Sequence, residues 1–239
     1  MTFSIVAREP QTGLFGVAVA SRFFAVGALC PHAAGDVGAL STQALINPTY
    51  GPRGLALLHE GKSPQEVVAA LVGADEGRAS RQLHVVDVEG ASAAHTGAEC
   101  VEWAGHLLGD GVSVAGNMLA GPSVIADMLA AYRQRYDLPL VERLLTAMDA
   151  AEAAGGDKRG RQSAALLVQG PEAYPRLSMR VDDHTEPLVE LRRLYAVAQE
   201  RFIPFSRAFP TAENPHGIHD RAEVDAMIEA AQKPAARSP

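Results

Sequence analysis

Hydrophobic positions near the start of the chain form short runs that are separated by turn-forming residues. Residues 3–8 and 14–20 are nearly continuous apolar runs, and residues 9–13 between them contain a Pro and a Gly. Continuous apolar runs predict strands that are covered on both faces, and the Pro and Gly predict a turn, so these runs form a hairpin. The same pattern predicts further strands in this half of the chain, at residues 25–29, 37–42, 81–88 and 91–96.

Helix-start signals and helical periodicity occur between and after these strands. Ser63, Pro64 and Glu66 form a capping box with a first-turn proline, which predicts a helix that ends near Gly73. Apolar residues spaced three and four apart predict two long consecutive helices at residues 123–136 and 138–154. The remaining predicted elements are helices at residues 53–60 and 185–202 and strands at residues 112–119, 163–168 and 177–181.

The order of these elements predicts an α+β fold. Strands and helices do not alternate regularly, and neither a GxGxxG after a strand nor a GxxxxGK[ST] is present, so a Rossmann fold is excluded. We expect residues 1–203 to form two mainly antiparallel sheets packed face to face with helices outside. Residues 204–239 are rich in proline and are expected to form a C-terminal extension with one short helix at residues 221–231, partly disordered at its end.

Composition and charge narrow the class of function. The 239 residues are 47% hydrophobic and 21% charged, as in ordinary globular proteins. A net charge of -7 argues against a nucleic-acid partner. Neither an apolar run of about 18 residues nor a signal-peptide pattern is present, so we expect a cytoplasmic protein with no membrane partner.

No cofactor or metal ion is expected. The two cysteines, Cys30 and Cys100, belong to no CxxC motif or Cys/His cluster. The segment 182–184 (Asp-Asp-His) lacks a fourth ligand at a suitable spacing, which favours a strand end followed by a helix cap. His216 and His219 lie in the proline-rich tail, where a loop is expected.

Thr2 suggests a specific chemistry. It follows the initiator Met, and a small residue in this position normally leaves the Met open to removal. Thr2 would then carry a hydroxyl and a free α-amine, which are the nucleophile and the base of an N-terminal threonine. A terminal amine has a pKa of about 7.7–8.0, so much of it is neutral at working pH. Many soluble proteins begin in the same way, so the rest of the chain has to support this hypothesis.

Six stretches carry a resemblance to a known family. They are TFSIVAR (2–8), GVAVASRFFAVGAL (16–29), STQALINPTYGPRGL (41–55), AGNMLAGP (115–122), GGDKRGRQSAALLV (155–168) and RVDDH (180–184). Through them the chain resembles the bacterial and archaeal family called "domain of unknown function 1028", whose name supplies no reaction. The strand that begins at Thr2 and the later layout also resemble the N-terminal nucleophile (Ntn) hydrolases of the proteasome type. That broader resemblance implies a four-layer αββα sandwich and hydrolysis of an amide bond.

Residues near the predicted first hairpin are candidates to assist Thr2. Ser4 lies on the same strand face as Thr2, so it supports the terminus and the substrate or else is a plain strand residue. It is also the second-choice nucleophile, which would need a separate base. Ser21 and Arg22 end the second strand, beside Thr2 if the hairpin is antiparallel. The proteasome-type pattern has an acidic residue here and a lysine in the following strands, and this chain has neither. Arg22 is a candidate for the missing positive charge, or else a surface arginine.

Two further segments supply amide groups. Gly116 and Asn117 end an apolar strand, where Gly permits close approach of the backbone and Asn offers N–H donors for an oxyanion. Both are also turn residues, so a simple turn is the alternative. Gln43 and Asn47 flank an apolar stretch and are expected to bind polar parts of a substrate, or to be satisfied loop amides.

Residues 155–163 combine glycines, three cations and an Asp just before a predicted buried strand. In the proteasome-type layout this loop would bring Asp157 and Ser163 to the amine of Thr2. Arg159 or Arg161 would bind a substrate carboxylate through two parallel hydrogen bonds. A solvated charged loop is the alternative.

We therefore predict a cofactor-free amidohydrolase that cleaves a C–N bond of a small, carboxylate-bearing substrate. Its catalytic residues are expected to be Thr2, Asn117, Asp157 and Ser163. One alternative is a catalytically silent binding or scaffold protein that acts through self-association or a partner enzyme. An ester- or lactone-cleaving hydrolase would use the same site. A homodimer is expected in either case.

Overall fold

The computed structural model of the protein describes residues 2–232. Contacts within it divide the chain into two compact units, residues 1–191 and residues 192–239. The domain boundary expected between residues 203 and 204 stays a prediction. Among the described residues, no helix combines the length and the apolar character that crossing a bilayer requires.

The first unit contains two antiparallel sheets, as predicted. The larger sheet has the strand order β10-β9-β2-β1-β8-β7, and the smaller has the order β3-β4-β5-β6. The strands of the larger sheet are β1 (Thr2–Arg8), β2 (Phe15–Ser21), β7 (Gly105–Gly109), β8 (Val112–Asn117), β9 (Ser163–Gln169) and β10 (Pro175–Val181). Those of the smaller sheet are β3 (Pro31–Ala34), β4 (Gly38–Ala44), β5 (Arg81–Asp87) and β6 (Ser92–Thr96).

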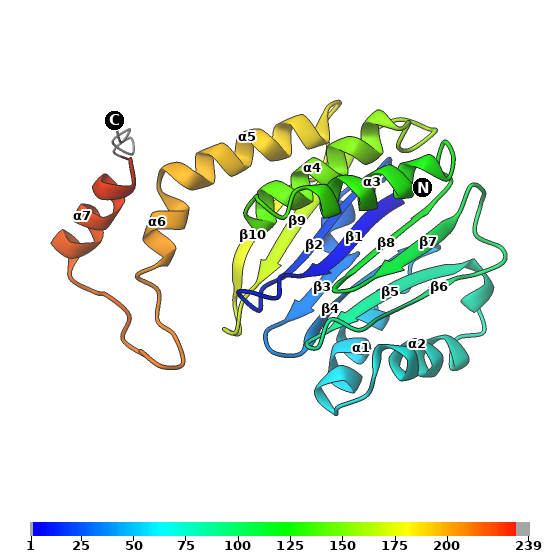
Figure 1. The fold of residues 1–239 in the computed structure, drawn as a ribbon, viewed down its shortest axis with the longest axis horizontal. Helices are drawn as coiled ribbons and strands as arrows, with labels where there is room; N and C mark the ends of the chain where they lie inside the picture. The colour runs from blue at the N-terminus through cyan, green and yellow to red at the C-terminus, as the bar shows by residue number, and fades with distance from the viewer. Residues whose placement is uncertain (1, 233–239) are drawn as a thin grey trace. The chain divides into compact units, whose positions relative to one another are not determined.

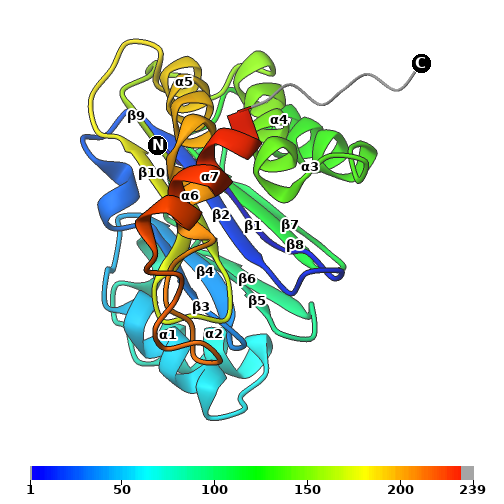
Figure 2. The same ribbon diagram turned by 90° about the vertical axis from the view of Figure 1, so that its left-hand side faces the viewer.

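Helices lie on the outer side of each sheet in this unit. Figure 1 shows α3 (Ser123–Gln134) and α4 (Leu140–Ala153) over the larger sheet, and α1 (Tyr50–His59) and α2 (Pro64–Gly73) against the smaller one. The view in Figure 2, turned by 90°, shows the same arrangement. The capping box predicted at the start of α2 is present, because Ser63 and Glu66 bond each other's backbone N–H.

Strand β1 is buried on both faces, which explains its continuous apolar sequence. Val6 packs with Ala39 and Val86 of the smaller sheet. Ser4 points the same way, because successive side chains of a strand alternate between its faces. Thr2 has the same parity, so its side chain also faces the smaller sheet.

A buried arginine helps to hold α4 on the larger sheet. Arg143 is fully buried and donates to the carboxylate of Glu9 at 3.0 Å. Its guanidinium carbon lies 4.6 Å from the ring centre of Tyr132 and 4.7 Å from that of Tyr136. The carboxylate and the faces of the two rings compensate a charge that would otherwise be strongly destabilising in the interior.

One predicted strand of this unit was wrong, and two strands and a second 3-10 helix were missed. Residues 25–29 were expected to form a strand, but a short 3-10 helix, η1 (Val26–Ala28), lies there. Strand β3 was missed because it begins at Pro31, a residue that sheets tolerate at a strand start or an edge. Strand β7 was missed because it is a short edge strand bounded by glycines, with Leu107 and Leu108 exposed. A second 3-10 helix, η2 (Arg78–Ser80), precedes β5.

The second unit is helical. Helix α5 (Pro187–Glu200) spans the point of division, and α6 (Phe202–Ser206) and α7 (Arg221–Gln232) follow. Ala208, Val224 and Ile228 form a small apolar cluster. Helix α7 lies where the sequence predicts a short helix in the tail. The disorder predicted for the end of the tail falls outside the described residues.

Candidate active site

Thr2 belongs to a row of polar residues that crosses four adjacent strands. The strand register pairs Thr2 with Ser21 on one side and with Asn117 on the other, and Ser21 in turn with Ser163. Paired residues point to the same face of a sheet, so all four side chains face the smaller sheet. The hydroxyl oxygens of Thr2 and Ser21 lie 3.1 Å apart.

A pocket of about 190 Å³ opens beside this row. Its polar lining comes from Thr2, Ser21, Gln43 and Arg159. Most of the remaining wall is apolar and consists of Phe23, Val26, Leu29, Cys30, Ile46 and Met118. Burial raises the pKa of the Cys30 thiol to about 12, so this thiol is a neutral part of the wall. The volume is below the roughly 300–1,000 Å³ of drug-sized sites, which fits a small substrate.

The backbone at the pocket is held in a conformation that is unusual for residues with a side chain. Ala44 and Met118 line the pocket with φ angles of 70° and 55°, and Ala25, next to the lining residue Val26, has a φ of 52°. Such left-handed conformations persist only where the surrounding structure enforces them, and they concentrate at functional sites. The strain therefore supports a functional role for this pocket.

A buried network of amide side chains joins the two sheets next to Thr2. One terminal atom of Gln82 lies 2.8 Å from the carbonyl oxygen of Gly116 and 3.0 Å from that of Gly105. Carbonyl oxygens only accept, so this atom is the nitrogen and the other is Oε1. Oε1 therefore accepts from Nδ2 of Asn117 at 3.0 Å and from Nε2 of Gln43 at 2.8 Å. Two backbone carbonyls thus fix the orientation of three amides.

The same logic fixes the proton of a buried histidine. The hydroxyl of Ser4 donates to Oε1 of Gln43 at 2.6 Å. Its contact with Nε2 of His84, at 2.8 Å, then requires Nε2 to donate, and Nδ1 accepts from the Ser113 hydroxyl at 3.0 Å. Burial, followed by the effect of His106, lowers the pKa of His84 to about 3, so the ring is neutral.

This arrangement bears on the two roles considered for Ser4. His84 already carries its proton on the nitrogen that faces Ser4, so this nitrogen cannot remove the hydroxyl proton. Ser4 is also completely buried. The geometry favours Ser4 as a support for Gln43 and the strand face below Thr2.

The loop of residues 155–162 lies near the start of β1. A Cβ added to Gly156 would lie 3.4 Å from the ring of Phe3. The carboxylate of Asp157 accepts from the backbone N–H of Arg22 at 2.9 Å and from that of Arg159 at 2.8 Å, and it pairs with the Arg159 guanidinium at 3.3 Å. The Arg22 guanidinium donates to the carbonyl of Arg159. Asp157 therefore joins the end of β2 to this loop and orients Arg159; its contact with the Thr2 amine stays a prediction.

Ser163 holds the segment that follows β2. Its hydroxyl donates to the carbonyl of Phe23 and accepts from the N–H of Val26 at 3.2 Å. These bonds position two residues of the pocket wall. Strand β2 lies between β9 and β1, so Ser163 and Thr2 are separated by two strand spacings, about 10 Å. The predicted contact of Ser163 with the Thr2 amine stays a prediction.

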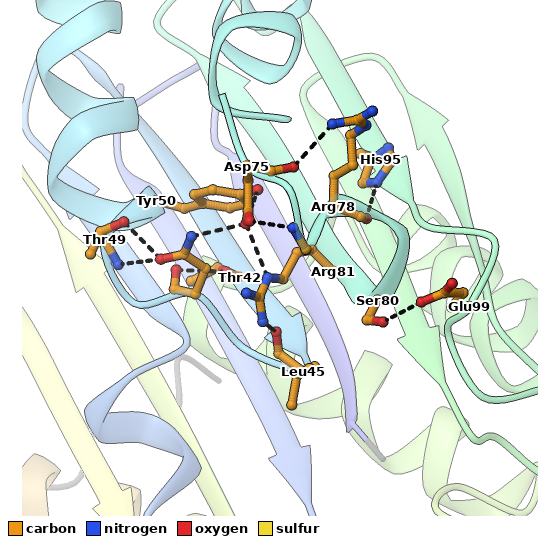
Figure 3. Close-up of polar contacts among 12 residues, drawn as sticks. Thr42, Leu45, Thr49, Tyr50, Asp75, Arg78, Ser80, Arg81, His95 and Glu99 are labelled. Atoms are coloured by element: carbon orange, nitrogen blue, oxygen red, sulfur yellow. Dashed lines mark hydrogen bonds and ion pairs between the residues drawn. The ribbon is translucent and has the colours of Figure 1, made fainter. Parts of the chain in front are cut away.

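Asn47 is held by a cluster around Asp75. Figure 3 shows Tyr50 and Arg81 beside Asp75 in this cluster. The Asp75 carboxylate accepts from Asn47 at 3.0 Å, from the Tyr50 hydroxyl at 2.8 Å and from Nε of Arg81 at 3.0 Å. These hydrogen bonds, first those from Asn47 and Tyr50, hold the pKa of Asp75 well below its usual range. The Asn47 side chain thus has the partner expected of a satisfied loop amide, whereas its predicted contact with a substrate stays a prediction. Asn47 also anchors the segment that carries Ile46 into the pocket.

Arg161 lies apart from the Thr2 pocket. It pairs with Glu152 and Glu186 and lines a separate surface pocket with them. Asp182 pairs with Arg180, and Nδ1 of His184 accepts from the N–H of Glu186. Across residues 2–232 no group of three or more His, Cys, Asp or Glu side chains is placed to hold a metal ion.

Gln82, His84 and Asp75 were missed by the sequence reasoning. Gln82 and His84 alternate with Leu83 and Val85 in a strand expected to be buried. Two polar residues on one face of such a strand signal a buried polar network, because buried polar groups need partners. Asp75 had no comparable signal, since its partners come from a loop, the start of a helix and the start of a strand.

Comparisons with known proteins show to which family the chain belongs. The family model described as "Family of unknown function (DUF1028)" matches residues 2–191. The crystal structure of protein SPO2555 from Silicibacter pomeroyi, described with the same family model, is 34% identical with a TM-score of 0.85, and the match covers 92% of this chain and 96% of that one. Anbu (ancestral beta-subunit) from Yersinia bercovieri is 12% identical with a TM-score of 0.38, covering 82% of this chain and 94% of that one, which is too low to carry an argument. No curated protein matches the sequence.

Proposed function

The chain belongs to the DUF1028 family, whose description assigns no reaction, and from this premise we propose that it is an N-terminal nucleophile hydrolase that cleaves the amide bond of a small substrate. One observation carries the proposal. Thr2 lies at a strained pocket, on a four-strand row of polar side chains, with Asn117 as its register partner. The proposed fold is the four-layer αββα sandwich of Ntn hydrolases, with which the two antiparallel sheets and their outer helices agree.

The reaction follows from the groups around Thr2. Removal of Met1 exposes the α-amine of Thr2, which takes the proton of the Thr2 hydroxyl as Oγ1 attacks the amide carbon. The negative charge that develops on the carbonyl oxygen is held by an N–H of Asn117. The C–N bond breaks, the proton passes to the leaving amine, and an ester on Thr2 remains. Water then hydrolyses this ester and releases a carboxylic acid.

The proposed substrate is small and bears a carboxylate. Arg159 lines the pocket with a half-exposed side chain whose orientation is set by Asp157. A guanidinium suits a carboxylate through parallel hydrogen bonds. The apolar wall opposite accommodates the uncharged part of the molecule. An ester or lactone would react by the same steps.

A covalent probe tests the proposal. Intact-mass measurement of natively expressed protein is expected to show loss of Met1. A β-lactone then adds once, because Oγ1 attacks the lactone carbonyl, the ring C–O bond breaks, and the proton passes to the released oxygen. Peptide mass spectrometry is expected to place the adduct on Thr2, and Thr2→Ala to abolish it.

A matched variant controls for the loss of a threonine. Thr146 is half-buried on α4, and its hydroxyl donates to the carbonyl of Glu142 at 2.8 Å, so Thr146→Ala removes a bonded threonine hydroxyl outside the proposed machinery. This variant is expected to keep the adduct. Retention of Met1, or an adduct that survives Thr2→Ala, contradicts the proposal.

A catalytically silent binding protein is the second candidate. It is favoured by the charges at the pocket: the acidic residue and the lysine of the proteasome-type pattern are absent from their expected places, and the cation that lines the pocket is Arg159, which is paired with Asp157. Lys158, in the same loop, instead donates to the carbonyl of Glu102 at 2.7 Å. Such a protein would bind a small carboxylate equally well with and without Thr2→Ala and would form no adduct.

A further inference from the structure

Gln82 connects both sheets at the point where β8 ends beside Thr2. Its Nε2 donates to the carbonyls of Gly105 and Gly116 and to the Thr96 hydroxyl, at 3.0, 2.8 and 2.9 Å. Three acceptors share two hydrogens, so at least one of these bonds is bifurcated. Gln82 is completely buried on β5, so the smaller sheet holds the backbone of the larger sheet at this end.

The Oε1 atom of Gln82 also determines how Asn117 is oriented. It accepts one hydrogen of the Asn117 amide, which forces the nitrogen of that amide toward Gln82. An amide NH2 group is planar and has two hydrogens, so fixing the direction of one N–H also fixes the direction of the other. Asn117 is the last residue of β8, and the left-handed Met118 that follows it turns the chain away from the strand. The Asn117 side chain therefore relies on its hydrogen bond to Gln82 for its orientation.

Gln43 is oriented by the same oxygen. Its Nε2 donates to Oε1 of Gln82, and its own Oε1 accepts from Ser4. Gln43 lines the pocket, so a change at Gln82 would be felt at the pocket wall as well as at Asn117. A single atom therefore sets the direction of two amides beside the proposed nucleophile.

We propose that Gln82 is a positioning residue for the proposed reaction: it aims the Asn117 amide at the oxyanion and touches no reacting atom itself. The inference rests on the proposed function for its chemical meaning. Its geometric part, that Gln82 orients Asn117, stands independently and is tested separately.

The kinetic test uses β-lactone inactivation of the full chain. Gln82→Met keeps the length of the side chain but removes both its donor and its acceptor. The maximal inactivation rate is expected to fall by about tenfold. This loss is smaller than the 100- to 1,000-fold that is typical of deleting an oxyanion donor, because Asn117 itself remains. The half-saturating lactone concentration is expected to change by less than about twofold, because ground-state binding is not what the oxyanion donor supplies.

Two further variants separate positioning from general loss of stability. Gln169 is also a buried glutamine that donates to backbone carbonyls. It lies on β9 and pairs with Phe15, at the end of β2 that is farthest from Ser21. Gln169→Met is expected to destabilise the fold and to leave the inactivation rate of folded protein unchanged. Gln82→Glu offers both a donor and an acceptor only when the introduced, buried carboxyl is protonated. The lactone inactivation rate of Gln82→Glu, relative to wild type, is therefore expected to rise as the pH falls from 9 to 6.

Nuclear magnetic resonance of the Thr2→Ala chain tests the geometry without any chemistry. The side-chain NH2 signals of Asn117, assigned by their loss in Asn117→Asp, are expected to show slowed exchange with water. Adding Gln82→Met is expected to speed this exchange at least tenfold. Unchanged Asn117 signals, or an unchanged inactivation rate in Gln82→Met, overturn the proposal. If Asn117 is released but wild type forms no adduct, Gln82 keeps its positioning role and the hydrolase function is what fails.

Discussion

His84 is a buried histidine that stays neutral because burial opposes a charge on its ring. It donates to Ser4 and accepts from Ser113, so the neutral ring has a partner at both nitrogens. Its pKa of about 3 in the folded protein lies below the ordinary value of 6.5. The unfolded chain therefore binds one more proton than the folded chain between these values. Stability supplied by this residue is present above pH 6.5 and is lost as the pH falls toward 3.

Replacing His84 by Gln should remove this acid sensitivity. Glutamine offers one donor and one acceptor for the two serines but does not titrate. Below pH 6, the free energy of unfolding of wild type is expected to fall by up to about 1.4 kcal/mol per pH unit more steeply than that of His84→Gln. Urea unfolding at several pH values measures this slope. Gln169→Met, which removes no titratable group, should keep the wild-type slope; equal slopes for wild type and His84→Gln would contradict the buried neutral ring.

At this scale the sequence predicted the residues that local rules can place. The two-residue period put Ser4 on the face of Thr2, and the hairpin brought Ser21 beside Thr2. Gln82 and His84 were missed because their partners lie on the other sheet, far away in sequence. No periodicity encodes which strands face each other, so a contact between sheets needs the fold first.

The segment that joins β4 to α1 is the least regular part of the pocket wall. It begins after the left-handed Ala44, the last residue of β4, and carries Ile46 into the pocket wall. The Thr42 hydroxyl donates to the carbonyl of Asn47, and the backbone N–H of Leu45 donates to the carbonyl of Ser80. Asp75 adds the side-chain contacts, because its carboxylate accepts from Asn47, Tyr50 and Arg81.

Asp75→Asn should loosen this segment selectively. An amide nitrogen cannot accept from the donors that now meet the carboxylate, so the free energy of unfolding is expected to fall by about 1.5–3 kcal/mol, the range for a hydrogen bond to a charged group. The half-saturating concentration of the lactone should rise, because the wall around Ile46 becomes mobile. Denaturant unfolding and inactivation kinetics measure the two effects.

An exposed Asp–Arg pair provides the comparison for this variant. Asp137 pairs with Arg135 at 3.0 Å, with both side chains largely exposed. Asp137→Asn should lower the free energy of unfolding far less than Asp75→Asn does, because solvent screens exposed pairs. Similar losses for the two variants would show that the Asp75 cluster does not hold the segment.

Whole elements were predicted better where they are long and periodic. Helices α2, α3 and α4 were found within a few residues because caps and apolar spacing are local signals. The strand predicted at residues 25–29 was wrong because Val26 and Ala28 are apolar for another reason. Val26 packs with Val19, Cys30 and Ala165 as part of a short turn of helix. Apolar residues alone do not distinguish a strand from a short buried helix.

At the scale of the molecule, the interior between the sheets changes character along its length. One region is apolar, where Val6, Phe15 and Val17 pack with Ala39 and Val86. The end that contains Thr2 is polar and is held by the amide network of Gln82. Polar groups between sheets are stable only when their partners are complete, and this requirement makes the Thr2 end a well-ordered place for chemistry.

The proposed site is confined to the first unit, and this leads to a prediction about the tail. Every residue that lines the Thr2 pocket lies between positions 2 and 159. A chain that ends at Glu200, the last residue of α5, is therefore expected to fold and to react with the lactone at a rate within about twofold of the full chain. Val224→Asp in the full chain is the matched variant, because it disrupts the apolar cluster of the second unit without shortening the protein. Inactivation kinetics and thermal unfolding measure both. A large loss of rate in either variant would mean that residues beyond 200 contribute to the site, and the pocket described here would then be incomplete.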